Sequence, residues 1–400
     1  MADPTPVYLS ALGLVNALGR GKGEVARRLF QGHTGGMVVE DGWIPGRPAR
    51  VGRVPDPLPE LPEQLPGSRT SRLILAALEE IRDEVEAERA RCGPERIGVV
   101  LGTSTAGVGE METAIAWFDR HGALPLDFHY QSQEMGAPAR FLARHLGLTG
   151  PAYTVSTACT SSGKALAAAR NLIRLGLCDA VITGGADSLG GLTLNGFSSL
   201  GAASPAPCNP MSRNRTGINI GEGAVLFVLR TRPADIALLG VGESSDAYHI
   251  SSPEPDGLGA ERAMAMALAD AGLTGREPGY LNLHATGTEK NDEMESRAVA
   301  RVFPHGIPCS GTKPLTGHML GTAAATELAF CWLTLASRWN PDGLLPPHCW
   351  DGQADPALPA LRLALPGTPA GRLRFCMSNA FAFGGNNLAL VVGRSQGVSG

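Results

Sequence analysis

The chain has 400 residues, of which 43% are hydrophobic and 18% charged, and its formal net charge is −4. This composition is typical of a compact folded protein with two or three structural units, and it excludes a general nucleic-acid binder, for which a basic balance or tract is expected. The eight cysteines form no C-x-x-C pair, and no apolar stretch reaches membrane-spanning length, so we expect free thiols, a cytoplasmic location and no membrane contact.

Apolar runs of strand length alternate with helical patterns in the first half of the chain. Strands are predicted at residues 7–15, 96–101, 152–158, 180–183 and 224–229, and helices at 71–90 and 163–175. Residues 40–68 are rich in proline and are expected to form a surface excursion.

The second half begins near residue 234 and repeats this alternation. It predicts strands at 236–241 and 280–283, helices at 260–271, 292–302 and 319–339, and two antiparallel strands at 375–379 and 388–392. Residues 340–371 are expected to form a second irregular excursion. The alternation of strands and helices predicts an α/β fold whose sheets are covered by helices.

A cysteine stands between a predicted strand and a predicted helix in the run from Val155 to Gly163. A helix N-terminus offers unpaired N–H groups and a partial positive charge, and both favour the thiolate, which is the reactive form. Most cysteines are simply small buried hydrophobes, as Cys331 is expected to be in its apolar helix. The position of Cys159 instead indicates a nucleophile.

Two histidines follow predicted strands in polar, glycine-containing turns. His284 lies in the run Leu283 to Thr288, and His318 follows Thr316 and Gly317. With Cys159 they form a candidate Cys/His/His catalytic set. The three are too far apart in sequence for an ordinary zinc site and imply no fourth ligand, so no metal is expected.

With these motifs in place, the chain resembles the β-ketoacyl-acyl carrier protein synthases of the type I/II condensing-enzyme group, which belong to the thiolase superfamily. The matching segments are Thr157 to Ser161, Asn282 to Glu295, Lys313 to His318, and Ser378 to Asn387. The resemblance implies a thiolase-like fold in which two duplicated α/β halves form a five-layered α-β-α-β-α arrangement. The halves would be residues 1–233, with the nucleophile, and 234–400, with both histidines and the lysine.

The resemblance also implies a reaction. Cys159 would accept an acyl chain from the phosphopantetheine thioester of an acyl carrier protein. A malonyl thioester would then lose carbon dioxide, and its carbanion would attack the acyl-enzyme to give a β-ketoacyl thioester two carbons longer. His284 and His318 would donate hydrogen bonds to the developing enolate oxygen, and the backbone N–H groups of Cys159 and Phe383 would serve the acyl transfer.

Further residues receive supporting roles from the resemblance. Lys313 would pair with Glu327 in a buried network, Phe383 would gate the acyl pocket, and Thr286 and Thr288 would hydrogen-bond the pantetheine arm. Thr105 falls where a bulky aliphatic residue often limits the acyl pocket, and with Gln133 nearby it indicates an unusual or longer acyl chain. No permanently bound cofactor is implied.

The expected partners are an acidic acyl carrier protein and a second chain, either an identical copy or a paralogous subunit. Basic residues that could meet the carrier are Arg69, Arg72, Arg213 and Arg215. The pathway is left open between fatty-acid and polyketide synthesis, and the segments Val7 to Ala11 and Gly42 to Arg47 resemble synthases of aryl-polyene clusters.

Three alternatives are weighed against the synthase. A non-catalytic subunit that sets chain length in a heterodimer would lack the nucleophile that Cys159 supplies. A thiolase would use another cysteine near the C-terminus, and the C-terminal glycine-rich loop has none. A starter-unit condensing enzyme would have asparagine in place of His318.

Overall fold

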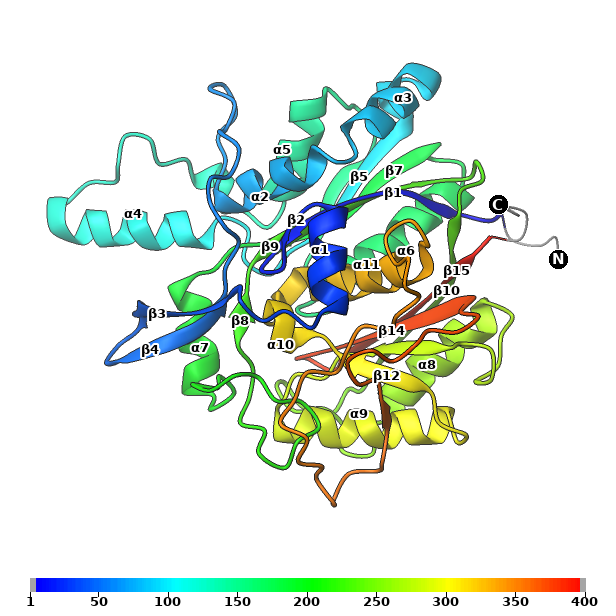
Figure 1. Ribbon diagram of the computed structural model, residues 1–400. Coiled ribbons are helices and arrows are strands. Elements are labelled where there is room, and N and C mark those ends of the chain that lie inside the picture. Colours follow the sequence, from blue (N-terminus) through cyan, green and yellow to red (C-terminus); the bar gives the residue numbers. More distant parts are fainter. Residues whose placement is uncertain (1–4, 396–400) are drawn as a thin grey trace.

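The computed structural model describes residues 5–395 (Figure 1). The strands of the first half are β1 (Tyr8–Asn16), β2 (Gly19–Arg20), β3 (Met37–Ile44), β4 (Arg47–Gly52), β5 (Ile97–Gly102), β6 (Ala152–Val155), β7 (Ala180–Asp187), β8 (Ile220–Gly221) and β9 (Gly223–Arg230). Its helices are α1 (Lys22–Phe30), α2 (Arg69–Leu78), α3 (Arg82–Cys92), α4 (Val108–His121), α5 (Ala137–Leu146), α6 (Ser161–Arg174) and α7 (Gly191–Ser199).

The second half has the same character. Its strands are β10 (Ile236–Ser245), β11 (Tyr280–Leu283), β12 (Pro308–Gly311), β13 (Arg362–Leu363), β14 (Phe375–Ala382) and β15 (Asn386–Arg394). Its helices are α8 (Leu258–Asp270), α9 (Glu289–Val302), α10 (Lys313–Thr316) and α11 (Ala323–Leu335).

The main sheet has 12 strands, and its two halves repeat one pattern. The order β1-β9-β7-β5-β6 in the first half corresponds to β10-β15-β14-β11-β12 in the second. In each order, the first strand pairs antiparallel with the second and the second pairs antiparallel with the third. The third, fourth and fifth strands pair in parallel. The halves meet where β1 pairs with β10 at Tyr8 and Ala237. The division of the chain into domains at residues 1–233 and 234–400 stays a prediction.

Helices α6 and α11 lie between the two halves of the sheet and contact each other (Figure 1). Helix α6 packs on β5 and β7, and α11 packs on β14 and β15. Helices α2 and α5 cover the outer face of the first half, while α8 covers that of the second and packs against α9. Helix α11 is apolar on nearly all sides, which suits a helix buried on all sides. The α/β class and the five layers are therefore those predicted.

Four element predictions were wrong in detail. The expected helix 71–90 is two helices, because the buried apolar α2 ends at Leu78 and the charged α3 turns toward solvent. The expected helix 319–339 begins at Ala323, because Leu320 has a φ of 48° that interrupts it, and it ends at Leu335. The segment expected to be an excursion at 40–68 contains most of the hairpin β3–β4. Strand 152–158 ends at Val155, where its partner β5 also ends.

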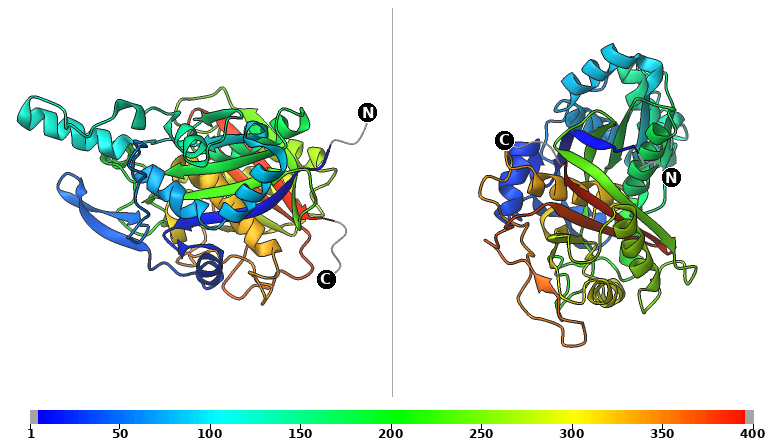
Figure 2. Two further views of the ribbon diagram at one scale, coloured as in Figure 1. Left: turned by 90° about the horizontal axis from the view of Figure 1, so that it is seen from above. Right: turned by 90° about the vertical axis from the view of Figure 1, so that its right-hand side faces the viewer.

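Two elements project from the layered body of the molecule. Helix α4 and the hairpin β3–β4 project from the same side of the body, as Figure 2 shows most clearly from above. None of the helices between residues 5 and 395 is both long and apolar enough to cross a bilayer.

Candidate active site

Cys159 lies in the tight turn that joins β6 to α6. Ala158, just before it, has a φ of 52°, and Ser161 N–H closes the turn by donating to the Ala158 carbonyl at 3.0 Å. Helix α6 begins at Ser161, so the cysteine precedes the N-cap residue. A Cβ on Gly102 would lie 2.2 Å from the Ser162 nitrogen. Glycine at the end of β5 is what allows α6 to start this close to the sheet.

His284 and His318 both approach Cys159 from the second half of the chain. His284 follows β11, and His318 follows the short helix α10, which begins just after β12. Strands β11 and β12 are parallel neighbours, so their carboxyl ends meet at one edge, where sites of α/β folds usually form. The backbone of His318 is fixed on both sides, because its N–H donates to the Asn219 carbonyl at 2.6 Å and its carbonyl accepts from Gly221 N–H at 3.0 Å.

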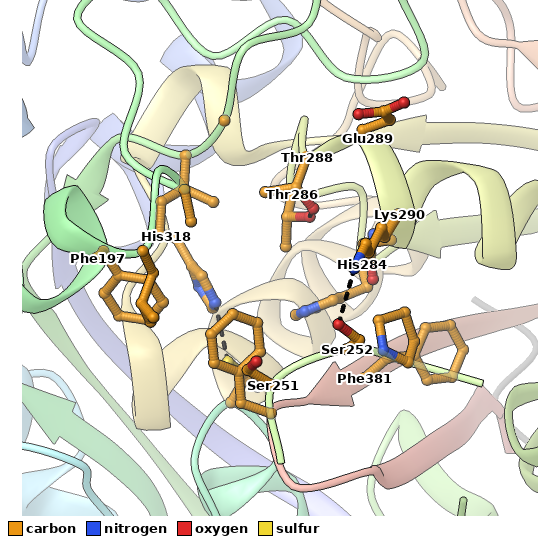
Figure 3. Close-up of a pocket in the computed structure, with 18 of the residues that line it drawn as sticks. Phe197, Ser251, Ser252, His284, Thr286, Thr288, Glu289, Lys290, His318 and Phe381 are labelled. Atoms are coloured by element: carbon orange, nitrogen blue, oxygen red, sulfur yellow. Dashed lines mark hydrogen bonds between the residues drawn. The ribbon is translucent and has the colours of Figure 1, made fainter. Parts of the chain in front are cut away.

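These residues lie in a cavity of about 420 Å³ (Figure 3). His318 Nε2 is 3.0 Å from Cys159 Sγ, and the two imidazole rings lie 5.4 Å apart and nearly perpendicular. All three side chains are buried, at 1% to 6% exposure, although they line the cavity. The structure therefore brings together the Cys/His/His set that the sequence indicated.

Lys313 and Glu327 form a buried ion pair behind His284. The Lys313 ammonium donates to Glu327 and to the His284 carbonyl, and it lies 3.3 Å from His284 Nδ1. An ammonium group can only donate, so Nδ1 accepts and the ring proton resides on Nε2, the atom on the cavity side. Burial first, and then the charge of Lys313, hold the pKa of His284 well below its usual value. His284 is thus a neutral imidazole with an N–H donor facing the cavity.

The same three side chains present a set of potential metal ligands. Their ligand atoms lie within 4.8 Å of one another, and thiolate with imidazole is a donor set that zinc accepts. A metal needs a bare ring nitrogen, however, and Lys313 fixes the proton of His284 on its cavity-facing nitrogen. The residues fit a hydrogen-bonded oxygen better than a metal ion.

The charge state of Cys159 differs from the sequence expectation. Burial raises the pKa of its thiol to about 12, and the opposing effects of Lys313 and of the backbone N–H groups of Phe383 and Cys159 are smaller. The helix N-terminus was expected to favour the thiolate, but burial acts in the opposite direction and is the larger effect, and Cys159 precedes the N-cap residue. Burial, followed by Lys313, also lowers the pKa of His318 well below its usual value. The resting pair is a thiol beside a neutral imidazole.

The other predicted pocket residues are divided between the cavity and its surroundings. Phe383 lines the cavity at 37% exposure, with its ring 5.6 Å from that of Phe197 in α7. Thr286 and Thr288 line the wall, and their hydroxyl oxygens lie 2.8 Å apart. These positions suit a gate and two wall donors, and the roles themselves stay predictions.

Thr105 and Gln133 do not line the cavity of the single chain. Thr105 is buried, and its hydroxyl donates to Asp187 Oδ1 at 2.8 Å, so this carboxylate rather than an acyl chain holds it. Gln133 is half-buried and directly follows a short helical turn. Their assignment to the acyl pocket stays a prediction.

Several residues in or near the cavity were missed or misjudged from the sequence. Asp187 is fully buried and Ser251, Ser252 and Lys290 line the cavity. An ionisable residue ending an otherwise apolar and glycine-rich strand was the available signal for Asp187. Arg69 is a poor candidate for the carrier rim, because it pairs with the buried carboxylate of Glu222.

Comparison with known proteins gives consistent matches. A family model described as "Beta-ketoacyl synthase, N-terminal domain" matches residues 63–234, and one described as "Beta-ketoacyl synthase, C-terminal domain" matches residues 236–345. Nodulation protein E of Rhizobium meliloti (strain 1021) is 35% identical over 74% of this chain and 75% of the relative. The 3-oxoacyl-[acyl-carrier-protein] synthase 2 of Vibrio cholerae is 31% identical over 80% of each.

Solved structures share the fold. A chain from the complex of the ketosynthase ApeO with its chain length factor ApeC, from Xenorhabdus doucetiae, has a TM-score of 0.93 and 45% identity, covering 98% of both chains. A β-ketoacyl synthase from Burkholderia phymatum has a TM-score of 0.86 and 26% identity, covering 98% of this chain and 100% of that one.

Proposed function

Because the chain belongs to the β-ketoacyl synthase family of acyl-transferring condensing enzymes, we propose that it extends an acyl chain held on Cys159 with malonyl-acyl carrier protein. The product is a β-ketoacyl-acyl carrier protein longer by two carbons, formed by decarboxylative Claisen condensation. The observation that carries this proposal is that the thiol of Cys159, from the first half of the chain, and the imidazoles of His284 and His318, from the second half, meet in one cavity.

In the first half-reaction, Cys159 Sγ attacks the thioester carbonyl of an acyl carrier. The thiol is protonated at rest, and His318 Nε2 at 3.0 Å takes its proton. The bond between the acyl carbonyl carbon and the pantetheine sulfur breaks, and this leaving sulfur receives the proton from His318. The products are acyl-Cys159 and a free carrier thiol. The backbone N–H groups of Cys159 and Phe383 approach the sulfur and suit the oxyanion of this step.

In the second half-reaction, malonyl carrier loses carbon dioxide and leaves an enolate. His284 Nε2–H, fixed by Lys313, donates to the enolate oxygen. His318 Nδ1 has no hydrogen-bond partner among the described residues, so neither tautomer of its ring is fixed. After the first half-reaction the ring proton can therefore move to Nε2 and be donated to the same oxygen. The enolate carbon then attacks the carbonyl carbon of acyl-Cys159, a C–C bond forms and the C–S bond to Cys159 breaks. The cysteine sulfur leaves as a thiolate and takes up one proton from solvent water.

The proposal includes a second chain of the same fold, either a copy or a paralogue. Large apolar side chains are exposed in and after α4: Ile115, Trp117, Phe118, Leu124, Leu126, Tyr130 and Met135. Strand β6 is also an end strand of the main sheet, with Tyr153 39% exposed. An unpaired strand edge and a projecting helix with exposed apolar side chains each favour burial against a partner. The Xenorhabdus doucetiae complex pairs a ketosynthase with a chain length factor, which supports a paralogous partner for this chain.

The alternative is that this chain is itself the non-catalytic, chain-length-setting subunit. The buried thiol of Cys159 beside His318 argues for the catalytic role, because such a subunit needs no nucleophile.

Intact-protein mass spectrometry after incubation with acyl-acyl carrier protein distinguishes the catalytic hypothesis from the non-catalytic one. If the chain is catalytic, we expect a mass increase of one acyl group on Cys159, no such increase in Cys159→Ala, and a β-ketoacyl product once malonyl-acyl carrier protein is added. Absence of loading, alone and with candidate partner chains, would overturn the proposal.

A further inference from the structure

Lys290 differs from the other lysines of this chain. The sequence contains four, and three of them pair with carboxylates: Lys22 with Glu80, Lys164 with Glu243 and Lys313 with Glu327. Within residues 5–395 no ion pair joins Lys290 to a carboxylate. Its ammonium is thus a cation whose charge is not neutralised by the protein.

Lys290 lies at the rim of the reactive cavity. It is exposed in the first turn of α9, two residues beyond Thr288, and lines the same cavity as Cys159. Its ammonium donates to the Ser252 hydroxyl at 3.0 Å, as Figure 3 shows. Ser252 and its neighbour Ser251 are half-buried and line the cavity too. The lysine is therefore oriented across the mouth, with the Ser252 hydroxyl beside its ammonium.

The other charged groups around the cavity leave Lys290 as its available cation. Arg215 pairs with Asp355 and is 7% exposed. The Asp246 carboxylate accepts from Asn387 and from the Glu254 N–H. Glu289 is exposed beside Lys290 in sequence, but in Figure 3 its carboxylate is turned away from Ser252. An anion entering the mouth would meet Lys290 and Ser252 together.

We propose that Lys290 and Ser252 bind the phosphodiester of the pantetheine arm that carries the acyl and malonyl groups. The inference rests on the proposed function, since it needs a thioester on such an arm. The thioester must reach Cys159 at the buried end of the cavity, so the phosphate at the other end of the arm stays near the mouth. An anionic oxygen there accepts a charge-assisted hydrogen bond from the ammonium and a second hydrogen bond from the hydroxyl.

The test compares two small substrates that differ by the phosphate alone: an acyl-pantetheine and the corresponding acyl-4′-phosphopantetheine. Acylation of Cys159 is followed by mass, and the quantity measured is the ratio of kcat/KM for the phosphorylated over the unphosphorylated substrate. Lys290→Ala is expected to lower this ratio about two- to fivefold, the range for one ion pair near a surface. Lys290→Arg should restore most of it, and added salt should lower the wild-type ratio.

Arg262→Ala is the matched control, since Arg262 is an exposed cation of α8 that does not line the cavity. Its ratio should equal that of the wild type. A coenzyme A thioester forms a third arm of the test, and it separates a site for one phosphodiester from a site for any larger polyphosphate.

The outcomes also separate the two proposals. If neither substrate acylates Cys159, the proposed function fails. If both acylate it and Lys290→Ala leaves the ratio at the wild-type value, the phosphate site is wrong and the proposed function stands.

Discussion

Asp187 Oδ2 accepts a hydrogen bond from the Thr322 hydroxyl at 2.9 Å, across the boundary between the two halves of the fold. Its other oxygen accepts from Ser104 N–H and from the turn residues Thr103 and Thr105. Thr322 ends the short helical turn Leu320–Thr322, which follows His318 and Met319, and Ser104 donates weakly to the Ala158 carbonyl at 3.4 Å. One buried carboxylate thus connects the turn of the nucleophile with the turn of its histidine.

Asp187→Asn is expected to disturb this connection on one side. An amide keeps one oxygen acceptor, but its NH₂ group cannot accept from Thr322. We expect stability to fall by about 1–3 kcal/mol and decarboxylation of malonyl carrier to fall more than acyl loading of Cys159. Denaturant unfolding and the two partial reactions measure this. Thr322→Val removes the same hydrogen bond from the other side and should give the same pattern, whereas equal losses in both partial reactions would contradict the argument.

Lys313→Met should act mainly through His284. Without the ammonium, nothing holds the ring proton on Nε2, so we expect decarboxylation to fall by about one to two orders of magnitude. The fold should survive, because burial already raises the pKa of Glu327 to about 7 and the carboxyl can take up a proton. Carbon dioxide release from malonyl carrier is the measurement. Release at the wild-type rate would show that Lys313 does not set the tautomer.

The pH dependence of Cys159 alkylation tests its charge state. With its pKa raised to about 12 by burial, the thiolate fraction grows about tenfold for each pH unit. The rate of modification by iodoacetamide should therefore rise steadily from pH 7 to about pH 10 without levelling. The peptide that contains Cys159 must be followed by mass, because Cys92 and Cys349 are partly exposed. A plateau near neutral pH would instead mean a resting thiolate–imidazolium pair.

From the buried ring of His348 we predict that the stability of the fold decreases in acid. Its Nδ1 accepts a hydrogen bond from Gly311 N–H, its Nε2–H donates to the Pro210 carbonyl, and burial lowers its pKa to about 4. The unfolded chain takes up a proton below about pH 6.5 while the folded chain does not, so stability falls as the pH drops from 6.5 to 4. The contribution is up to about 3 kcal/mol.

Unfolding free energies of the wild type and His348→Asn, measured at several pH values in this range, isolate the contribution of His348. His284 and His318 titrate in both proteins, so their share cancels. The variant should show the shallower slope, and equal slopes would contradict the assignment.

The sequence determined the parts of this protein that depend on neighbours in the chain. The apolar run of β11 ended where the pattern indicated, and α6 began within two residues of its expected start, because periodicity and turn residues are local properties. The polar turns marked Cys159, His284 and His318 for the same reason. The family resemblance then supplied the fold class and the reaction class.

The tertiary structure decided what depends on residues distant in the chain. The protonation of Cys159 follows from burial, which outweighs the local helix field that the sequence displays. The tautomer of His284 depends on Lys313, and Thr105 is bound by Asp187 rather than exposed to the cavity. Charge states and hydrogen-bond partners arise from the dielectric surroundings and close contacts of the folded chain. Spacing along the sequence specifies neither of these.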